Sequence, residues 1–120
     1  MEKLKILLMN SPGINLEEFD REYNKNRGHI LMPPLALTTI AGNVLKKVDN
    51  VEVKVLDMEF EIMKYFNENE KSPLSTRKLM KKKIVDKLNN FKPDLVGISL
   101  LFSPAHNNSF AIANIIKETN

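Results

Sequence analysis

The sequence contains no cysteine, which excludes a disulfide framework and any metal site built from thiolates. It also lacks an apolar run as long as a membrane span, and no secretory signal segment opens the chain, so we expect a cytoplasmic protein with no membrane span. Neither sign of charge predominates, because 18 basic and 15 acidic residues leave a net charge of only +3. This small excess does not indicate nucleic-acid binding.

The chain has 120 residues, of which 42% are hydrophobic, and this is enough for one core and too little for two. Its most informative stretch is residues 6–9, four consecutive apolar residues that predict a strand in the middle of a parallel sheet. The turn formers Asn10, Ser11, Pro12 and Gly13 follow at once. The chain therefore leaves the sheet at the strand's carboxyl end, where open α/β sheets bind their ligands.

Strand and helix patterns alternate along the rest of the chain. Residues 51–57 carry valine at alternate positions with charges between, which is typical of an edge strand, and residues 95–101 form a second largely apolar strand. Three- and four-residue apolar spacing predicts helices at 35–48, 58–72, 75–91 and 105–117. Right-handed crossovers then predict a flavodoxin- or Rossmann-like α/β fold, a three-layer sandwich with a parallel sheet in the strand order 2-1-3.

These patterns also predict how single residues are used. Gly42 should permit close approach of its helix to a strand, and Gly97 should mark a neighbouring backbone or ligand. The residues expected to face inward are Leu37, Ile40, Ala41, Val44, Leu45 and Val48 in the first helix and Phe110, Ile112, Ala113, Ile115 and Ile116 in the last.

A doubly wound sheet continues with another strand after such a last helix, but the pattern here stops. We therefore expect residues 1–120 to form the N-terminal part of a larger protein, with a sheet that is incomplete on its C-terminal side. The alternative is that another chain covers the apolar edge of the third strand, because an uncovered edge promotes association.

The predicted strand order places the loops after the first and third strands opposite each other. These loops are residues 10–13 and 102–105, and a ligand should lie across them. Asp57 and the long polar connection at 14–32 border the same edge. An alternative for each serine and proline is that it only shapes a turn.

Several familiar sites are excluded by the residues at this edge. No G-x-G-x-x-G or G-x-x-x-x-G-K-[ST] follows the first strand, which argues against a nicotinamide or P-loop site. A phosphoryl-accepting receiver domain needs acidic residues at the ends of strands one and three, where this chain has Asn10 and Leu101. His29 and His106 have no carboxylate or cysteine at ligand spacing, so we expect exposed loop or helix-start residues; the alternative is that one of them is an axial ligand.

The segments together resemble the N-terminal cobalamin-binding domain of cobalamin-dependent radical SAM enzymes. The resemblance is carried by residues 6–12, by Met32-Pro33-Pro34-Leu35-Ala36-Leu37, by the strand at 51–57 and by Pro93-Asp94-Leu95-Val96-Gly97-Ile98-Ser99. It implies a sheet that holds cobalamin over its carboxyl edge, in an accessory domain without a complete active site. It also implies a downstream radical SAM domain as partner, which carries an iron–sulfur cluster and S-adenosylmethionine.

Ser99-Leu100-Leu101 matches the S-x-L segment of cobalamin-binding domains, in which the serine contacts the cofactor's nucleotide tail. The candidate cofactor-binding residues are Asn10, Ser11, Pro12, Gly13, Pro34, Asp57, Ser99, Leu101, Phe102, Ser103 and Pro104. We predict no catalytic residue or metal ligand. The D-x-H-x-x-G loop that supplies a histidine to cobalt is absent after the first strand.

A second interpretation belongs to a different functional class, a non-catalytic α/β module. Such a module would bind a protein or an anionic surface through the exposed third strand or through the basic helix that contains Lys81, Lys82 and Lys83. A solvated helix face is the simpler explanation for those lysines.

Overall fold

The computed structural model describes residues 2–13, 16, 34–69, 71–100 and 103–119. Three parallel strands form the sheet: β1 (Leu4–Asn10), β2 (Val51–Leu56) and β3 (Leu95–Ser99). Their order is β2-β1-β3, with Ile6 opposite both Val53 and Leu95. The predicted parallel sheet and its strand order are therefore confirmed.

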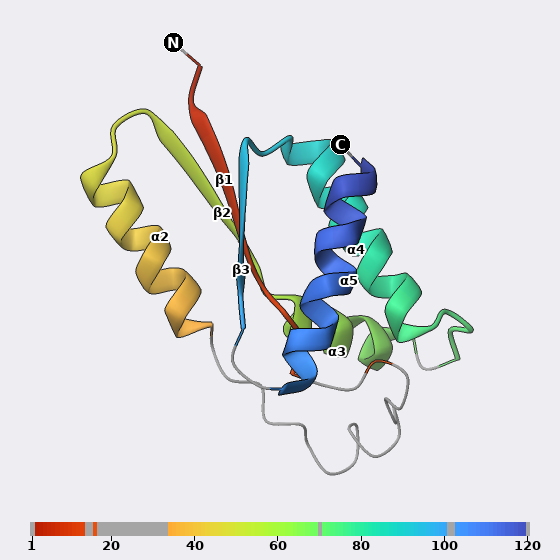
Figure 1. The fold of residues 1–120 in the computed structure, drawn as a ribbon. Coiled ribbons are helices and arrows are strands. Elements are labelled where there is room, and N and C mark those ends of the chain that lie inside the picture. Colours follow the sequence, from red (N-terminus) through yellow and green to blue (C-terminus); the bar gives the residue numbers. More distant parts are fainter. Residues whose placement is uncertain (1, 14–15, 17–33, 70, 101–102, 120) are drawn as a thin grey trace.

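In the described part of the chain, four helices accompany the sheet, namely α2 (Leu35–Lys47), α3 (Met58–Glu68), α4 (Thr76–Phe91) and α5 (Ser103–Thr119). Figure 1 shows α2 on one side of the sheet and α4 and α5 together on the other. This arrangement is the predicted three-layer, flavodoxin-like α/β fold. Among the described residues, no helix combines the length and the apolar character needed to cross a membrane.

Two helices begin at side-chain caps that the sequence carries. The carboxylate of Asp57 accepts a hydrogen bond from the Phe60 amide at 3.2 Å, and the hydroxyl of Ser75 accepts one from the Lys78 amide at 3.2 Å. We predicted that the second strand extends to Asp57, but β2 ends at Leu56 because Asp57 is the N-cap of α3.

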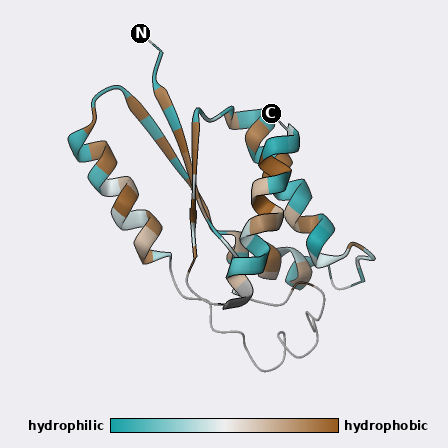
Figure 2. Cartoon of the chain, in the orientation of Figure 1, coloured by the Kyte–Doolittle hydropathy of each residue, from teal (hydrophilic) through white to brown (hydrophobic). Residues whose placement is uncertain are grey.

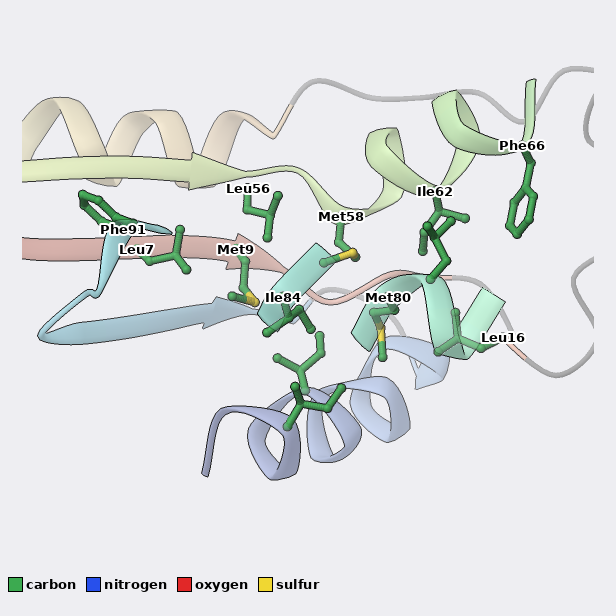
Figure 3. Close-up of a cluster of buried hydrophobic side chains, with 13 residues drawn as sticks. Leu7, Met9, Leu16, Leu56, Met58, Ile62, Phe66, Met80, Ile84 and Phe91 are labelled. Carbon is green, nitrogen blue, oxygen red and sulfur yellow. The ribbon is translucent and has the colours of Figure 1, made fainter. Parts of the chain in front are cut away.

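The larger core lies between the sheet and helices α3, α4 and α5. Figure 3 shows Leu7 of β1 at the end of this core where Phe91 lies, and Met9 nearer to Met58 and Ile84. Its buried members are Leu7, Met9, Leu16, Leu56, Met58, Ile62, Phe66, Leu79, Met80, Ile84, Phe91, Ile112 and Ile115. Met80, Ile84 and Phe91 of α4 are among them, so this side of α4 is buried.

The smaller core lies between the sheet and α2. Among the described residues, Ile6, Leu8 and Leu37 alone are buried there, with Ala41 and Val44 packed against them. The helix contacts the sheet through a narrow stripe of residues three or four apart, which leaves Ile40, Leu45 and Val48 exposed on or beyond its flanks. The prediction that these three residues face inward is therefore wrong.

The two glycines singled out in the sequence differ in their surroundings. A Cβ on Gly97 would lie 2.8 Å from Cδ2 of Leu8, so the predicted close neighbour exists and is a side chain of β1. No atom lies within 4 Å of a Cβ built on Gly42, so the predicted close approach of its helix is wrong.

In α5, Ile112 and Ile115 are buried as predicted, but Phe110 is 60% exposed and stacks edge-on against His106 instead.

Candidate functional site

The candidate site is the carboxyl edge of the sheet beside β1 and β3. These strands are parallel neighbours, and Asn10 and Ser99 are partners at their carboxyl ends. The chain passes from β1 toward α2 on one face and from β3 into α5 on the other, as Figure 1 shows. A crevice at such a switch point is where open α/β sheets bind ligands.

Asn10 joins the ends of β1 and β2. Its Nδ2 donates a hydrogen bond to Oδ1 of Asp57 at 2.9 Å, while its Oδ1 accepts one from the Met58 amide at 2.6 Å. The same Asp57 oxygen also caps α3. In the described part of the chain, Oδ2 of Asp57 forms no hydrogen bond, so this half-buried carboxylate has one oxygen available to a ligand.

Ser11 and Pro12 join the loop after β1 to α5. The Ser11 amide donates to the Ser99 carbonyl at 2.9 Å, and the Ser11 hydroxyl donates to the Ala105 carbonyl. The Asn108 Nδ2 donates to the Pro12 carbonyl at 2.8 Å. Ser11, Pro12 and Asn108 are buried, so they fix the shape of this edge through bonds made within the protein.

Ser99 is half-buried, and its hydroxyl makes no hydrogen bond to any described residue. Its partner in β1 is Asn10, and the pairs Leu8–Gly97 and Ile6–Leu95 continue the same face of the sheet toward the amino ends. This is the α2 face, since Ile6 and Leu8 pack on Leu37.

Helix α2 packs on β2 and β1, whereas Leu95 at the other end of this face of β3 is 57% exposed. We call Leu95, Gly97 and Ser99 the β3 strip. Within the described residues, the strip is a part of the sheet surface that α2 leaves open.

The remaining predicted site residues have different positions. Pro34 is the N-cap of α2, where its carbonyl accepts the Thr38 amide at 3.0 Å, and Gly13 is half-buried after β1. Ser103 and Pro104 are the first two residues of α5. Leu101 and Phe102 lie outside the described residues, as do His29 and nearly all of the connection at 14–32.

No metal centre is formed by the residues that the structure describes, since no three histidine, aspartate or glutamate side chains gather there. His106 is exposed in the first turn of α5, and the centroid of its ring lies 5.0 Å from that of Phe110.

Asn108 shapes the site but was not predicted from the sequence. Its position three residues after Ala105 and four before Ile112 places a polar side chain on the apolar stripe of α5, which is a signal that it has an internal partner.

Comparison of the chain with protein-family models, with curated proteins and with solved structures gives no match. The geometry of the carboxyl edge is therefore the basis for the proposal below.

Proposed function

We propose that this chain is a cobalamin-binding-type accessory domain of a cobalamin-dependent radical SAM enzyme. The observation that carries the proposal is the half-buried Ser99 hydroxyl, which has no hydrogen-bond partner among the described residues and lies beside the switch point. Every buried side-chain polar atom among the described residues has a partner, so the Ser99 hydroxyl is reached by solvent and is open to a ligand that brings hydrogen-bonding groups.

The residues present fit such a ligand. The β3 strip offers an apolar surface with a hydroxyl at its carboxyl end, which suits the nucleotide tail of cobalamin. The open oxygen of Asp57 provides a further polar contact at the same edge of the sheet. Cobalamin, when bound, supplies a cobalt centre for alkyl-group chemistry, while the iron–sulfur cluster and S-adenosylmethionine belong to a downstream domain.

The chain's own residues have binding and positioning roles in this proposal. Ser99 donates or accepts a hydrogen bond with the tail, and Asn10 holds the end of β1 to Asp57 and to the start of α3. Ser11 and Asn108 hold the loop after β1 against α5. With no D-x-H-x-x-G loop after β1, no histidine from that motif can serve as the lower ligand to cobalt.

Titration of the chain with hydroxocobalamin, followed by its visible spectrum, tests the proposal. Ser99→Leu replaces the free hydroxyl with a bulkier apolar group, and we expect it to weaken binding by at least about tenfold, or about 1.4 kcal/mol. Thr39→Ala is the matched control, because Thr39 is an exposed hydroxyl on α2. The proposal fails if the folded chain leaves the spectrum unchanged, or if Ser99→Leu binds as tightly as the parent.

A second candidate function is binding of an anionic membrane surface through α4. This helix has no acidic residue in its first turn, where Arg77 and Lys78 lie, although the helix dipole disfavours cations there. Lys81 and Lys82 are also exposed, whereas Lys83 forms an ion pair with Glu61 at 3.5 Å. Positive charge at this end of α4 does not stabilise the helix. Its concentration there is consistent with an anionic binding partner.

Binding to vesicles that contain phosphatidylserine tests this second function. Reversal of Lys78, Lys81 and Lys82 to glutamate should abolish binding, and binding by the parent should weaken steeply with salt. Reversal of Lys46 and Lys47 at the end of α2 is the control, because these lysines are also exposed but lie on another helix. Equal loss in both variants would indicate nonspecific attraction and contradict a role for α4.

A further inference from the structure

The carboxylate of Asp57 has one oxygen that is held in place and one that is open. Its Oδ1 accepts hydrogen bonds from the Asn10 Nδ2 at 2.9 Å and from the Phe60 amide at 3.2 Å. The Asn10 side chain is itself held, because its Oδ1 accepts a hydrogen bond from the Met58 amide at 2.6 Å. Since Oδ1 is bound by two donors, the direction of Oδ2 is fixed as well. The open oxygen is therefore a preorganised acceptor rather than a freely turning surface group.

This open oxygen is within reach of a ligand. Among the described residues, every buried side-chain nitrogen and oxygen has a hydrogen-bond partner, whereas Oδ2 of Asp57 has none. Oδ2 is therefore in contact with solvent, although the residue as a whole is half-buried. An ionised carboxylate accepts hydrogen bonds and cannot donate them, so the ligand group that replaces this solvent has to be a donor.

Asp57 has no ion-pair partner in the part of the chain that the structure describes. Strand β3, at the other end of the same edge, offers no positive charge either, because none of its residues is charged and Figure 2 shows it brown over most of its length. A ligand carboxylate or phosphate beside Asp57 would thus meet a like charge without compensation, which is costly. A neutral donor avoids this cost.

Asp57 and Ser99 lie at opposite ends of one row of residues along the carboxyl edge. Asn10 is the partner of Ser99 in the pairing of β1 with β3, and it is hydrogen-bonded to Asp57 on the side of β2. Neighbouring strands are about 4.8 Å apart, so the row spans roughly 10 Å. An inorganic ion is too small to contact both ends of this row, whereas a macrocycle with donor groups on its rim is wide enough.

We propose that Asp57 determines which corrinoids this edge accepts, because its open oxygen takes a hydrogen bond from a neutral amide N–H on the corrin rim and rejects corrinoids with carboxylates there. The side chains on the rim of cobalamin end in amides, which are neutral and donate hydrogen bonds. This inference rests on the proposed cobalamin function and adds the chemical form of the corrinoid to it. The net charge of +3 would by itself attract the acidic form, so a preference for amides has a local cause.

Equilibrium dialysis against two corrinoids that both lack the nucleotide tail tests the proposal. Cobinamide carries amides on its rim, whereas cobyrinic acid carries carboxylates at those positions. The visible absorbance of each corrinoid gives its bound and free concentrations. We expect the parent chain to bind cobinamide at least about tenfold more tightly than cobyrinic acid.

Asp57→Asn is the decisive variant, because it replaces the open acceptor with an amide donor while the other oxygen still accepts from Asn10 and Phe60. Asparagine and aspartate are about equally good N-caps, so α3 should begin at the same place. Cobinamide binding should weaken and cobyrinic acid binding should strengthen, so that the preference falls by at least about tenfold. Asp57→Ser keeps a capping oxygen and removes the open one, and it should also reduce the preference.

Asp86→Asn is the matched control, because it removes the same charge from an exposed position on α4 and should leave the preference unchanged. Equal affinity of the parent for the two corrinoids would overturn the inference. An unchanged preference in Asp57→Asn, or an equal shift in Asp86→Asn, would overturn it as well, while binding of hydroxocobalamin by the parent would still support the proposed function. If neither hydroxocobalamin nor cobinamide binds, the proposed function fails and this inference fails with it.

Discussion

The two faces of the sheet are covered very unequally. Of the residues that the structure describes, 13 are buried in the core between the sheet and α3, α4 and α5, whereas against α2 only Ile6, Leu8 and Leu37 are buried. Burial of apolar surface is the dominant favourable contribution to folding, so the first face supplies most of the stability. On this thinly covered second face, α2 leaves the β3 strip uncovered within the described residues.

One strand contributes to both faces. Alternate residues of β1 point in opposite directions, so Leu7 and Met9 enter the large core while Ile6 and Leu8 enter the small one. The difference between the faces therefore arises from the helices and from how many of them lie across from β1. Four substitutions test this comparison, beginning with the one expected to have the largest effect.

Ile84→Ala should destabilise the chain by about 4 kcal/mol, because it removes a fully buried side chain of α4 and leaves a cavity between the sheet and the helices. Urea denaturation followed by circular dichroism measures the change. With total stabilities of about 5–15 kcal/mol for such domains, much of the population would unfold at low denaturant. A loss below about 1 kcal/mol would show that this face does not dominate stability.

Leu37→Ala makes the corresponding change on the α2 face, where Leu37 is the only buried residue of the helix. We expect a loss of about 2 kcal/mol, at the low end for such substitutions, because α2 has one side in solvent and can move to close the gap. Hydrogen exchange should show faster opening of α2 amides with little change in α4. Equal losses for Leu37→Ala and Ile84→Ala would contradict the unequal importance of the two faces.

Gly97→Ala should cost about 1–2 kcal/mol, because the added methyl group would lie 2.8 Å from Cδ2 of Leu8 and must displace it. Combination with Leu8→Ala tests the cause. If the clash is with Leu8, the double variant should be more stable than the sum of the two single losses predicts, by about 1 kcal/mol. Strict additivity would mean that the cost of Gly97→Ala has another origin.

Much of the fold could be predicted from the sequence because its strands have strong patterns. Four consecutive apolar residues at 6–9 are all buried, as a central parallel strand requires. The exposure of Ile40, Leu45 and Phe110 could not be predicted, because apolar spacing indicates which side of a helix faces inward but not how much neighbouring structure covers it. The narrow contact of α2 with the sheet depends on tertiary packing.

The candidate site could be predicted in position but not in its internal contacts. The strand order places Asn10, Asp57 and Ser99 at one edge, and this follows from the chain order of strands and helices. The hydrogen bonds of Ser11 to Ala105 and of Asn108 to Pro12 depend on the exact placement of α5 against the loop. The sequence therefore could not separate residues that shape the edge, such as Ser11, from those with groups still open to a ligand, such as Ser99.

Gly42→Ala should have the smallest effect and the opposite sign. Gly42 is exposed within α2, and no atom lies within 4 Å of an added Cβ, so alanine meets no clash and stabilises the helix by up to about 1 kcal/mol. The same substitution at Gly97 is expected to destabilise, so the two glycines form a matched pair that reports how closely each is packed. Urea midpoints measured side by side check the signs. A loss at Gly42 would mean that this surface of α2 is covered in solution, and the thin coverage of the α2 face would then have to be revised.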